Sequence, residues 1–481
     1  MTYDPSAGDP VPKTSTGIQG LDEVLNGGLP TGCLTLLSGG PGSGKTILAL
    51  EFLVRGALAG RPGILLTFEE REEALRRYAR AFGWDVEALE RNGRLALIAA
   101  RFDANAIIAG EFDVGAILAV LRQQSEALGA RQVVIDAPDV FLRLLGNSVK
   151  ERAELHKIND WLRDQGMTAV VTVKAGSPDT SNQYDELLDY MADCVIQLDQ
   201  RVAEQVTTRR MRVVKYRGSN CGRNEYPFAI TDRGVWIIPV TRASLSQRAL
   251  GSAVSSGVPG LDAILSGGYR RGSCTLITGT SGTGKTTFAC AFVRSVASLG
   301  ERLLYLDFEE SWEAIVSCMT SSGIDLREPL GSGHLRFLSV MPESQGIEEH
   351  LIQVFRAIED FQPAFMVVDA ISACRRMGSE HAAFDYLLRL IDHCKARGIT
   401  TLLTNLTAFQ SETEEITGID LSSVIDTVII LRNTESAGAF RRELAILKSR
   451  GRNHSNRVHE FRITGHGIEI DSEPKEAGHG R

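Results

Sequence analysis

Two short stretches of the sequence combine glycines with a lysine and a threonine at a spacing that suits phosphate binding. Both follow the pattern G-x-x-x-x-G-K-[ST], at positions 39–46 and 279–286. Glycines let backbone N–H groups turn toward phosphate oxygens, the lysine adds positive charge, and the threonine hydroxyl can ligate Mg²⁺ at a helix N-terminus. A merely flexible turn would leave the lysines unexplained. The sequence therefore predicts two sites for ATP or GTP, built from Gly39, Gly40, Gly42, Ser43, Gly44, Lys45, Thr46, Gly279, Thr280, Ser281, Gly282, Thr283, Gly284, Lys285 and Thr286.

Two aspartates are candidates for supporting the metal ion of these nucleotides. Asp136 and Asp369 each end an apolar run that is typical of a buried parallel strand. Such a carboxylate emerges at the carboxyl end of the sheet, where it can hold Mg²⁺ together with Thr46 or Thr286. The alternative is an aspartate that only ends a strand in a turn.

Two pairs of glutamates also follow apolar runs, at Glu69, Glu70, Glu309 and Glu310. A carboxylate at this place can orient or deprotonate the group that attacks the γ-phosphate, so we expect these residues to be catalytic. The alternative is an exposed acidic pair at the start of a helix, where the helix dipole favours negative charge.

Cationic residues recur late in each half of the chain. They are Arg209, Lys215 and Arg217 in the first half, and Arg442, Lys448 and Arg450 in the second. Because they lie so far along the chain from the phosphate loops, we expect them to contact the nucleotide of a neighbouring subunit, as an arginine finger does. A solvated basic strand is the alternative.

The matching motifs belong to a tandem duplication. The offset between copies is 240 positions from Lys45 to Lys285 and from Glu70 to Glu310, and 233 positions from Asp136 to Asp369. A repeat of this length is a whole domain. We expect a first domain at 1–240, a Ser-rich linker at 241–253, a second domain at 254–470 and a disordered polar tail at 471–481.

The order of apolar and amphipathic segments predicts the fold class of each domain. In the first copy, strands are expected at 33–38, 63–68, 132–136, 168–173 and 194–198, with helices after residue 45, at 72–82 and near 151–164. Continuous apolar strands alternating with helices indicate an α/β fold, with a mainly parallel sheet covered on both faces. Alternating segments at 208–217 and 234–238 predict antiparallel strands that complete the sheet.

The composition limits the possible partners. The formal net charge is −8, so the chain lacks the basic excess that nucleic-acid binding demands. Its eight cysteines form no C-x-x-C motif and differ between the copies, which predicts reduced, mostly buried thiols. No run of 18 apolar residues and no leader-like N-terminus is present, so we expect a soluble cytoplasmic protein without membrane contact.

With its double phosphate loop, glutamate pairs and Lys-x-Arg motifs, the sequence resembles the KaiC family, the two-domain ATPases and autokinases of circadian timing in the RecA-like superfamily. The resemblance covers nearly all of residues 14–470, including the stretches 81–85 and 225–232. It implies two tandem RecA-like P-loop domains that bind ATP and Mg²⁺ between the subunits of a hexameric double ring. It also implies ATP hydrolysis in the first domain and serine/threonine autophosphorylation in the second.

The resemblance points to Ser422 and Ser423 as phosphoacceptors, because the family's phosphorylated pair lies just before the strand that precedes its second Lys-x-Arg. By position alone, a pair of turn or cap hydroxyls is an equal alternative. The matching stretch of the first copy, 186–195, has no hydroxyl except that of Tyr190, so we do not expect the first copy to phosphorylate itself.

Two departures from the family pattern affect other expectations. The family's long C-terminal extension, which binds KaiA, has no counterpart after residue 470, so a KaiB-like or other signalling protein is a more plausible partner than KaiA. The family also places a tryptophan against the adenine; the first copy has Trp84, and we take Ser322 as its counterpart in the second. Adenine stacking is therefore expected to be weaker in the second domain.

Two other functions remain open from the sequence. The RecA-like core also serves DNA recombinases and helicase-like motors, although the basic loops or DNA-binding module that these need are not evident. A nucleotide-switched scaffold with little catalysis is the other possibility.

Overall fold

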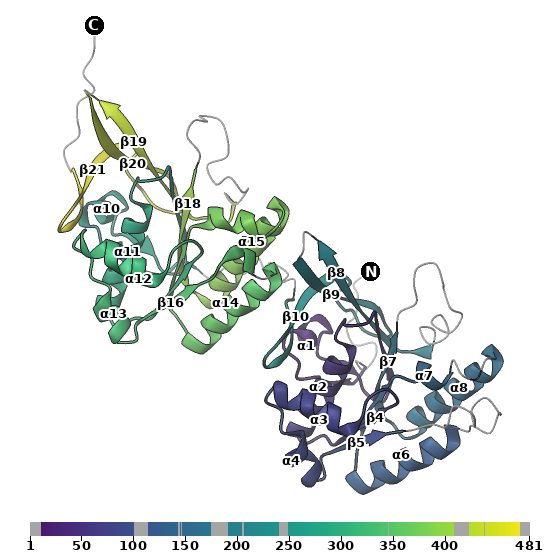
Figure 1. The fold of residues 1–481 in the computed structure, drawn as a ribbon. Helices are drawn as coiled ribbons and strands as arrows, with labels where there is room; N and C mark the ends of the chain where they lie inside the picture. The colour runs from purple at the N-terminus through teal and green to yellow at the C-terminus, as the bar shows by residue number, and fades with distance from the viewer. Residues whose placement is uncertain are drawn as a thin grey trace. The chain divides into compact units, whose positions relative to one another are not determined.

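The computed structural model describes residues 11–100, 114–142, 145, 147–174, 191–203, 206–239, 249–344, 346–407, 423–436 and 438–471. The chain divides into two compact units, residues 1–240 and 241–481, and each has its own sheet and core (Figure 1). Ser422, most of the expected linker and residues 472–481 lie outside the described residues.

The first unit is built on a nine-stranded sheet. From β5 to β8 every strand pairing is parallel, and β8, β9, β10 and β11 pair in antiparallel fashion. In spatial order the strands are β5 (Leu95–Ala99), β4 (Gly63–Thr67), β6 (Gln132–Asp136), β7 (Thr168–Lys174), β3 (Leu34–Gly39), β8 (Cys194–Ala203), β9 (Val206–Tyr216), β10 (Glu225–Thr231) and β11 (Gly234–Ile237).

Helices cover both faces of this sheet because its parallel strands are apolar throughout. One face packs against α1 (Leu21–Val24), α2 (Lys45–Leu58), α3 (Glu72–Ala81) and α4 (Val86–Arg91), and the other against α6 (Val114–Leu128), α7 (Asp139–Leu142) and α8 (Ser148–Asp164) (Figure 1). A two-stranded sheet of β1 (Lys13–Thr14) and β2 (Leu29–Pro30) precedes the phosphate loop.

The second unit repeats this sheet in the same spatial order. Its strands are β16 (Leu335–Ser339), β15 (Leu303–Asp307), β17 (Phe365–Asp369), β18 (Thr400–Leu406), β14 (Cys274–Gly279), β19 (Thr427–Ser436), β20 (Ala439–Ser449), β21 (His459–Thr464) and β22 (Gly467–Ile470). Its helices are α10 (Pro259–Ile264), α11 (Lys285–Ser298), α12 (Trp312–Thr320), α13 (Arg327–Gly331), α14 (Ile347–Phe361) and α15 (Glu380–Arg397), with 3₁₀ turns η2 (Pro342–Ser344) and η3 (Ile371–Met377). The expected fold class, α/β with a mainly parallel sheet in each half, is confirmed.

The second unit begins before the boundary expected from the sequence. Strand β12 (Ala253–Val254) pairs with β13 (Tyr269–Arg270), and the backbone N–H of Gly251 donates to the carbonyl of Arg271. Residues 251–253, which the sequence assigned to the linker, are thus part of the second unit in this structure.

The direction of the parallel strands gives each sheet two distinct edges, which we name after the strand ends that lie there. The carboxyl edge is where the parallel strands end, at Gly39 and Asp136 in the first unit and at Gly279 and Asp369 in the second. The amino edge is where they begin. Because β9 and β20 run antiparallel to their neighbours β8 and β19, they start at the carboxyl edge and end at the amino edge.

The eight cysteines are all free thiols, and five of them are buried. Among the helices that the structure describes, none is long and apolar enough to cross a lipid bilayer.

Candidate functional site

The first phosphate loop joins β3 to the N-terminus of α2. Gly44 adopts a left-handed conformation with φ of 98° just before the helix, which glycine tolerates without steric cost. The Lys45 ammonium donates to the carbonyls of Gly39 and Gly40 at 2.8 and 2.9 Å, and the Ser43 hydroxyl donates to Gly40 at 2.8 Å. The loop therefore curls around its own lysine and leaves the helix N-terminus facing the cavity, an arrangement that suits an anion.

A cavity of about 410 Å³ opens beside this loop. Its size falls in the range of small-molecule sites. It is lined by Pro41, Gly42, Gly44, Lys45, Thr46, Ile47, Glu69, Glu70, Tyr78, Asp136, Ala137, Asp139, Lys174 and Ile230. The structure thus brings together the loop, both glutamates and the aspartate that the sequence singled out, although 90 residues separate Thr46 from Asp136.

The acidic side of the cavity is organised around Asp136, which is only 2% exposed. One carboxylate oxygen accepts a hydrogen bond from Thr46 at 3.0 Å, and the other accepts one from Thr172. Two ligands that Mg²⁺ favours, a hydroxyl and a carboxylate, are therefore adjacent. The donor set fits a magnesium ion beside a bound triphosphate.

The two glutamates of the first unit differ in surroundings. Burial raises the pKa of Glu69, and the nearby carboxylates of Asp136 and Asp139 raise it further. Glu70 accepts a hydrogen bond from the Tyr78 hydroxyl at 3.4 Å. Both carboxylates line the cavity beside the phosphate loop, so each is in a position to orient or deprotonate a group that attacks the terminal phosphate.

The second phosphate loop has the same local structure. Gly284 has φ of 97° before α11, and the ammonium of Lys285 and the hydroxyl of Thr283 each donate to the carbonyl of Thr280 at 2.8 Å. Burial lowers the pKa of both loop lysines, and negative charge at Asp136 or Asp369 partly offsets this. A bound phosphate would supply the negative charge that favours the ammonium form.

The acidic residues of the second unit are arranged differently. Asp369 accepts from the Tyr305 hydroxyl at 2.7 Å and from Thr404. Glu309 and Glu310 are exposed, and Arg376 lies 3.6 Å from Glu309. The sequence reasoning did not identify Tyr305, Thr172, Thr404, Tyr78, Asp139 or Lys174. The alignment of the copies could have drawn attention to Thr172 and Thr404, which lie 232 positions apart at matching places.

The cations of the late strands are divided between the two edges. Arg442 lies at the carboxyl edge, where its Nε donates to the carbonyl of Gly282 in the phosphate loop of its own unit at 3.4 Å. Lys448 and Arg450 lie at the amino edge, where β20 ends beside the start of β19. Six residues of strand separate Arg442 from Lys448, which corresponds to roughly 20 Å. The strand thus carries two separate cationic positions, a division that the sequence did not indicate.

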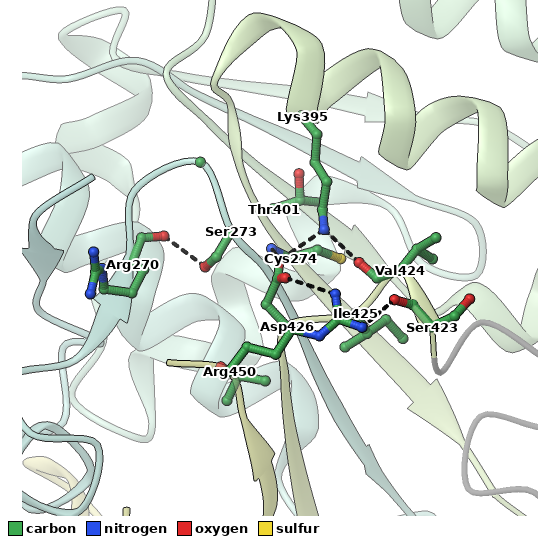
Figure 2. A network of polar contacts seen from close by, with 12 residues as sticks. Arg270, Ser273, Cys274, Lys395, Thr401, Ser423, Val424, Ile425, Asp426 and Arg450 are labelled. Atoms are coloured by element: carbon green, nitrogen blue, oxygen red, sulfur yellow. Dashed lines mark hydrogen bonds and ion pairs between the residues drawn. The ribbon is translucent and has the colours of Figure 1, made fainter. Parts of the chain in front are cut away.

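A polar cluster fixes the main chain at the amino edge of the second unit (Figure 2). The carbonyls of three successive residues each accept from a cation: Ser423 from Arg450 at 2.7 Å, Val424 from Lys395 at 2.6 Å, and Ile425 from Lys448 at 2.9 Å.

The next residue, Asp426, is 5% exposed and balances part of this positive charge. Its carboxylate accepts from Lys395 and from the backbone N–H of Cys274, both at 2.9 Å, and lies 3.8 Å from Arg450. Of the two expected phosphoacceptors, only Ser423 belongs to the described residues, and it is exposed at this edge. In Figure 2 its side-chain oxygen points away from the Arg450 guanidinium.

The expectation for Trp84 is wrong. Its side chain is 6% exposed and stacks on Phe82, with ring centroids 4.8 Å apart, inside the hydrophobic core. Its backbone N–H donates to Ala79, and Ile324 makes the equivalent bond to Met319, so the structural counterpart of Trp84 is Ile324 and not Ser322. Both residues fill the core because an apolar side chain is required under the turn. A difference in adenine stacking between the units therefore has no basis at this position.

A buried carboxyl in the second unit makes stability depend on pH. Burial raises the pKa of Asp307 to about 7, although its Oδ1 accepts from the backbone N–H groups of Glu309 and Glu310. An unfolded chain releases this proton at about pH 4. The contribution of Asp307 to stability is therefore present below about pH 4 and is lost as the pH rises to about 7.

Replacing Asp307 by threonine should remove much of this pH dependence. Thr67 occupies the same place in the first unit, and its hydroxyl accepts from the N–H groups of Glu69 and Glu70. Calorimetric unfolding of the nucleotide-free chain should show that Asp307→Thr loses less stability than wild type between about pH 4 and 7. Glu313→Gln, at an exposed carboxyl of the next helix, is the control. Equal pH slopes for Asp307→Thr and wild type would contradict the prediction.

Comparisons with known proteins agree with this geometry. The family model of the KaiC ATPase matches the chain twice, at residues 14–242 and 254–475. The chain is 38% identical to the circadian clock protein KaiC2 of Synechocystis sp. over 95% of its own length and 81% of the relative's. It is 33% identical to KaiC3 of the same organism, with 96% and 92% covered, and 33% identical to the circadian clock oscillator protein KaiC of Synechococcus elongatus, with 96% and 89% covered. The sheet is repeated in both units, and each copy has a phosphate loop at its carboxyl edge. Together with the family match along both halves, this shows that the chain belongs to the KaiC ATPase family and consists of two tandem RecA-like P-loop domains.

Proposed function

We propose that this protein binds and hydrolyses ATP in both units and that its second unit phosphorylates Ser422 or Ser423 of a neighbouring subunit. The observation that carries this proposal is the distance between the two edges of each sheet. The phosphate loop and its acidic residues lie at the carboxyl edge, while Ser423, Lys448 and Arg450 lie at the amino edge of the same unit.

The separation of the two edges explains why phosphoryl transfer to Ser423 needs a second subunit. A nucleotide in the second unit lies across the sheet from Ser423 of its own chain, beyond the reach of direct phosphoryl transfer. A ring in which the amino edge of one subunit faces the carboxyl edge of the next places the acceptor, Lys448 and Arg450 beside a neighbour's γ-phosphate. We propose a hexameric double ring, as the resemblance to the family implies.

The residues have the following roles in this proposal. The loop amides with Lys45 or Lys285 bind the phosphates, and Glu69, Glu70, Glu309 and Glu310 supply the base or orient the attacking group. Thr46 with Asp136, and Thr286 with Asp369, would hold Mg²⁺, which neutralises charge on the phosphate oxygens when it is bound. Lys215 with Arg217, and Lys448 with Arg450, contact the neighbour's nucleotide, while Arg442 stays with the phosphate loop of its own unit. Arg209, opposite Gln200 in the matching strand, takes the equivalent place in the first unit.

The relatives named above are circadian clock proteins. We propose that this chain has a signalling role of the same kind, in which the phosphorylation state of the second unit is read by a KaiB-like or other signalling protein. The net charge of −8 gives no support to the alternative of a DNA motor.

Each chain should bind two nucleotides. Lys45→Ala and Lys285→Ala should each reduce the stoichiometry from two ATP per chain to one at micromolar concentration, since losing a charged hydrogen-bond donor weakens binding by roughly 10- to 100-fold. Titration calorimetry measures the stoichiometry, with the exposed Lys150→Ala as control. Two sites of unchanged affinity in either variant would contradict the assignment of that loop.

The glutamates of the first unit should control hydrolysis without controlling binding. In a Lys285→Ala background, where only the first unit is active, the Glu69→Gln, Glu70→Gln pair should lower phosphate release by about 100-fold or more. ATP should still bind. Glu73→Gln, an exposed carboxylate one turn further along, is the matched control. Unchanged turnover in the double variant would exclude these residues as the base.

Phosphorylation of the acceptor should cross between subunits. Mixed rings are made from Lys285→Ala chains, which keep their serines, and from chains carrying Ser422→Ala and Ser423→Ala, which keep their second active site. Incubation with radiolabelled ATP and peptide mapping should place label within residues 411–432 of the Lys285→Ala chains only. Neither chain should incorporate label when incubated alone. Label on isolated wild-type monomers, separated from rings before incubation, would show transfer within one chain and defeat the proposed arrangement.

A further inference from the structure

The two units differ directly beneath the aspartate of the nucleotide site. In the first unit, Asp136 Oδ2 accepts from Thr46 of the phosphate loop at 3.0 Å, and Oδ1 accepts from Thr172. In the second, Thr404 donates to Asp369 Oδ1 in the same way, but Oδ2 accepts from Tyr305 at 2.7 Å. Thr286, the loop threonine, makes no hydrogen bond to Asp369 among the described residues.

Tyr305 is accommodated by coordinated changes around it. It occupies the place of Leu65, since Leu65 lies opposite Val134 and Tyr305 lies opposite Val367 in matching strand registers. At the same offset of 240 positions, Leu50 of α2 becomes Cys290 of α11, and Leu97 of β5 becomes Phe337 of β16. The smaller cysteine leaves room for the phenol ring, which packs on Phe337 with centroids 4.8 Å apart.

The tyrosine hydroxyl needs an acceptor because it is fully buried. Asp369 provides one, and this commits an acceptor position on the same oxygen that Asp136 offers to the loop threonine. An ionised carboxylate has about four such positions. While Tyr305 donates to it, Asp369 has one acceptor position fewer for hydrogen bonds from Thr286 and from metal-bound water.

We infer that Tyr305 is a positioning residue that weakens the support of Mg²⁺ by Asp369, so that the second unit requires more Mg²⁺ for nucleotide binding than the first. The inference rests on the proposed function, because it takes Asp369 and Thr286 as the residues that would hold the metal. Hydrogen bonds that orient a metal-ligating carboxylate usually favour metal binding. The bond from Tyr305 instead competes with it, because it occupies the oxygen that the loop threonine contacts in the first unit. The two units of one chain then respond to different ranges of Mg²⁺.

The test measures Mg²⁺ dependence of binding in the second unit, without relying on turnover. The full chain carries Lys45→Ala so that only the second unit binds, and a fluorescent, non-hydrolysable ATP analogue is titrated at a series of Mg²⁺ concentrations. Tyr305→Phe keeps the ring and removes only the hydroxyl. This variant should lower the half-maximal Mg²⁺ concentration by about tenfold, because one hydrogen bond to a charged group no longer competes for the Asp369 oxygen. Phe337→Leu disturbs the same aromatic pair but leaves the hydroxyl, so its midpoint should match that of the parent chain.

The reverse background supplies a second comparison. With Lys285→Ala in place of Lys45→Ala, the same titration reports on the first unit, whose midpoint should already lie below that of the second. A Tyr305→Phe midpoint that stays the same or rises would overturn the inference alone. Binding of the analogue in the Lys45→Ala chain that no Mg²⁺ concentration improves would overturn the proposed metal site, and the inference with it.

Discussion

The direction of the parallel strands is the constraint on which both proposed sites depend. Because the strands all end at one edge, the phosphate loop, Asp369 and the glutamate pair of the second unit converge there from segments far apart in the sequence. Strand β19 runs parallel to β14 and begins at the other edge, where Ser423 precedes it, and the reversal into β20 brings Lys448 and Arg450 back to that edge. One sheet thus separates the nucleotide from the acceptor within a chain, and assembly would reunite them.

Much of this could be predicted from sequence because the signals are local. Apolar runs placed β4 and β6 to within a residue, and the amphipathic pattern at 72–82 became α3, Glu72–Ala81. The short strand β5 was not predicted, since five apolar residues without flanking signals do not distinguish a strand. The bond between Tyr305 and Asp369 spans 64 residues, and nothing in the local pattern of either residue reveals it. Trp84 illustrates a converse error, because an aromatic residue near a nucleotide motif can equally be a core residue.

The duplication also shows which features of the site can vary and which are fixed by the fold. The phosphate-loop conformation, the strand order and the threonine that donates to Oδ1 of the aspartate are alike in both units. These features determine where the phosphate groups would bind. The residues beneath them differ as a set: the second unit has Cys290 and Tyr305 where the first has Leu50 and Leu65, which adds one buried hydroxyl. The two sites therefore differ in the core beneath the aspartate, while the phosphate-binding backbone is alike in both units.

The cationic residues at the amino edge are present in both units. In the first unit Asp193 lies 3.4 Å from Arg163 and 3.5 Å from Arg217. Asp426 of the second unit forms the corresponding ion pairs with Lys395 at 2.9 Å and Arg450 at 3.8 Å. The first unit has this arrangement although the sequence at its matching stretch offers no serine or threonine as acceptor. A function tied only to the phosphoacceptor would not explain the cations of the first unit. The proposed contact with a neighbour's triphosphate would explain both sets, and the second unit differs in that the carbonyl of Ser423 belongs to the same cationic cluster.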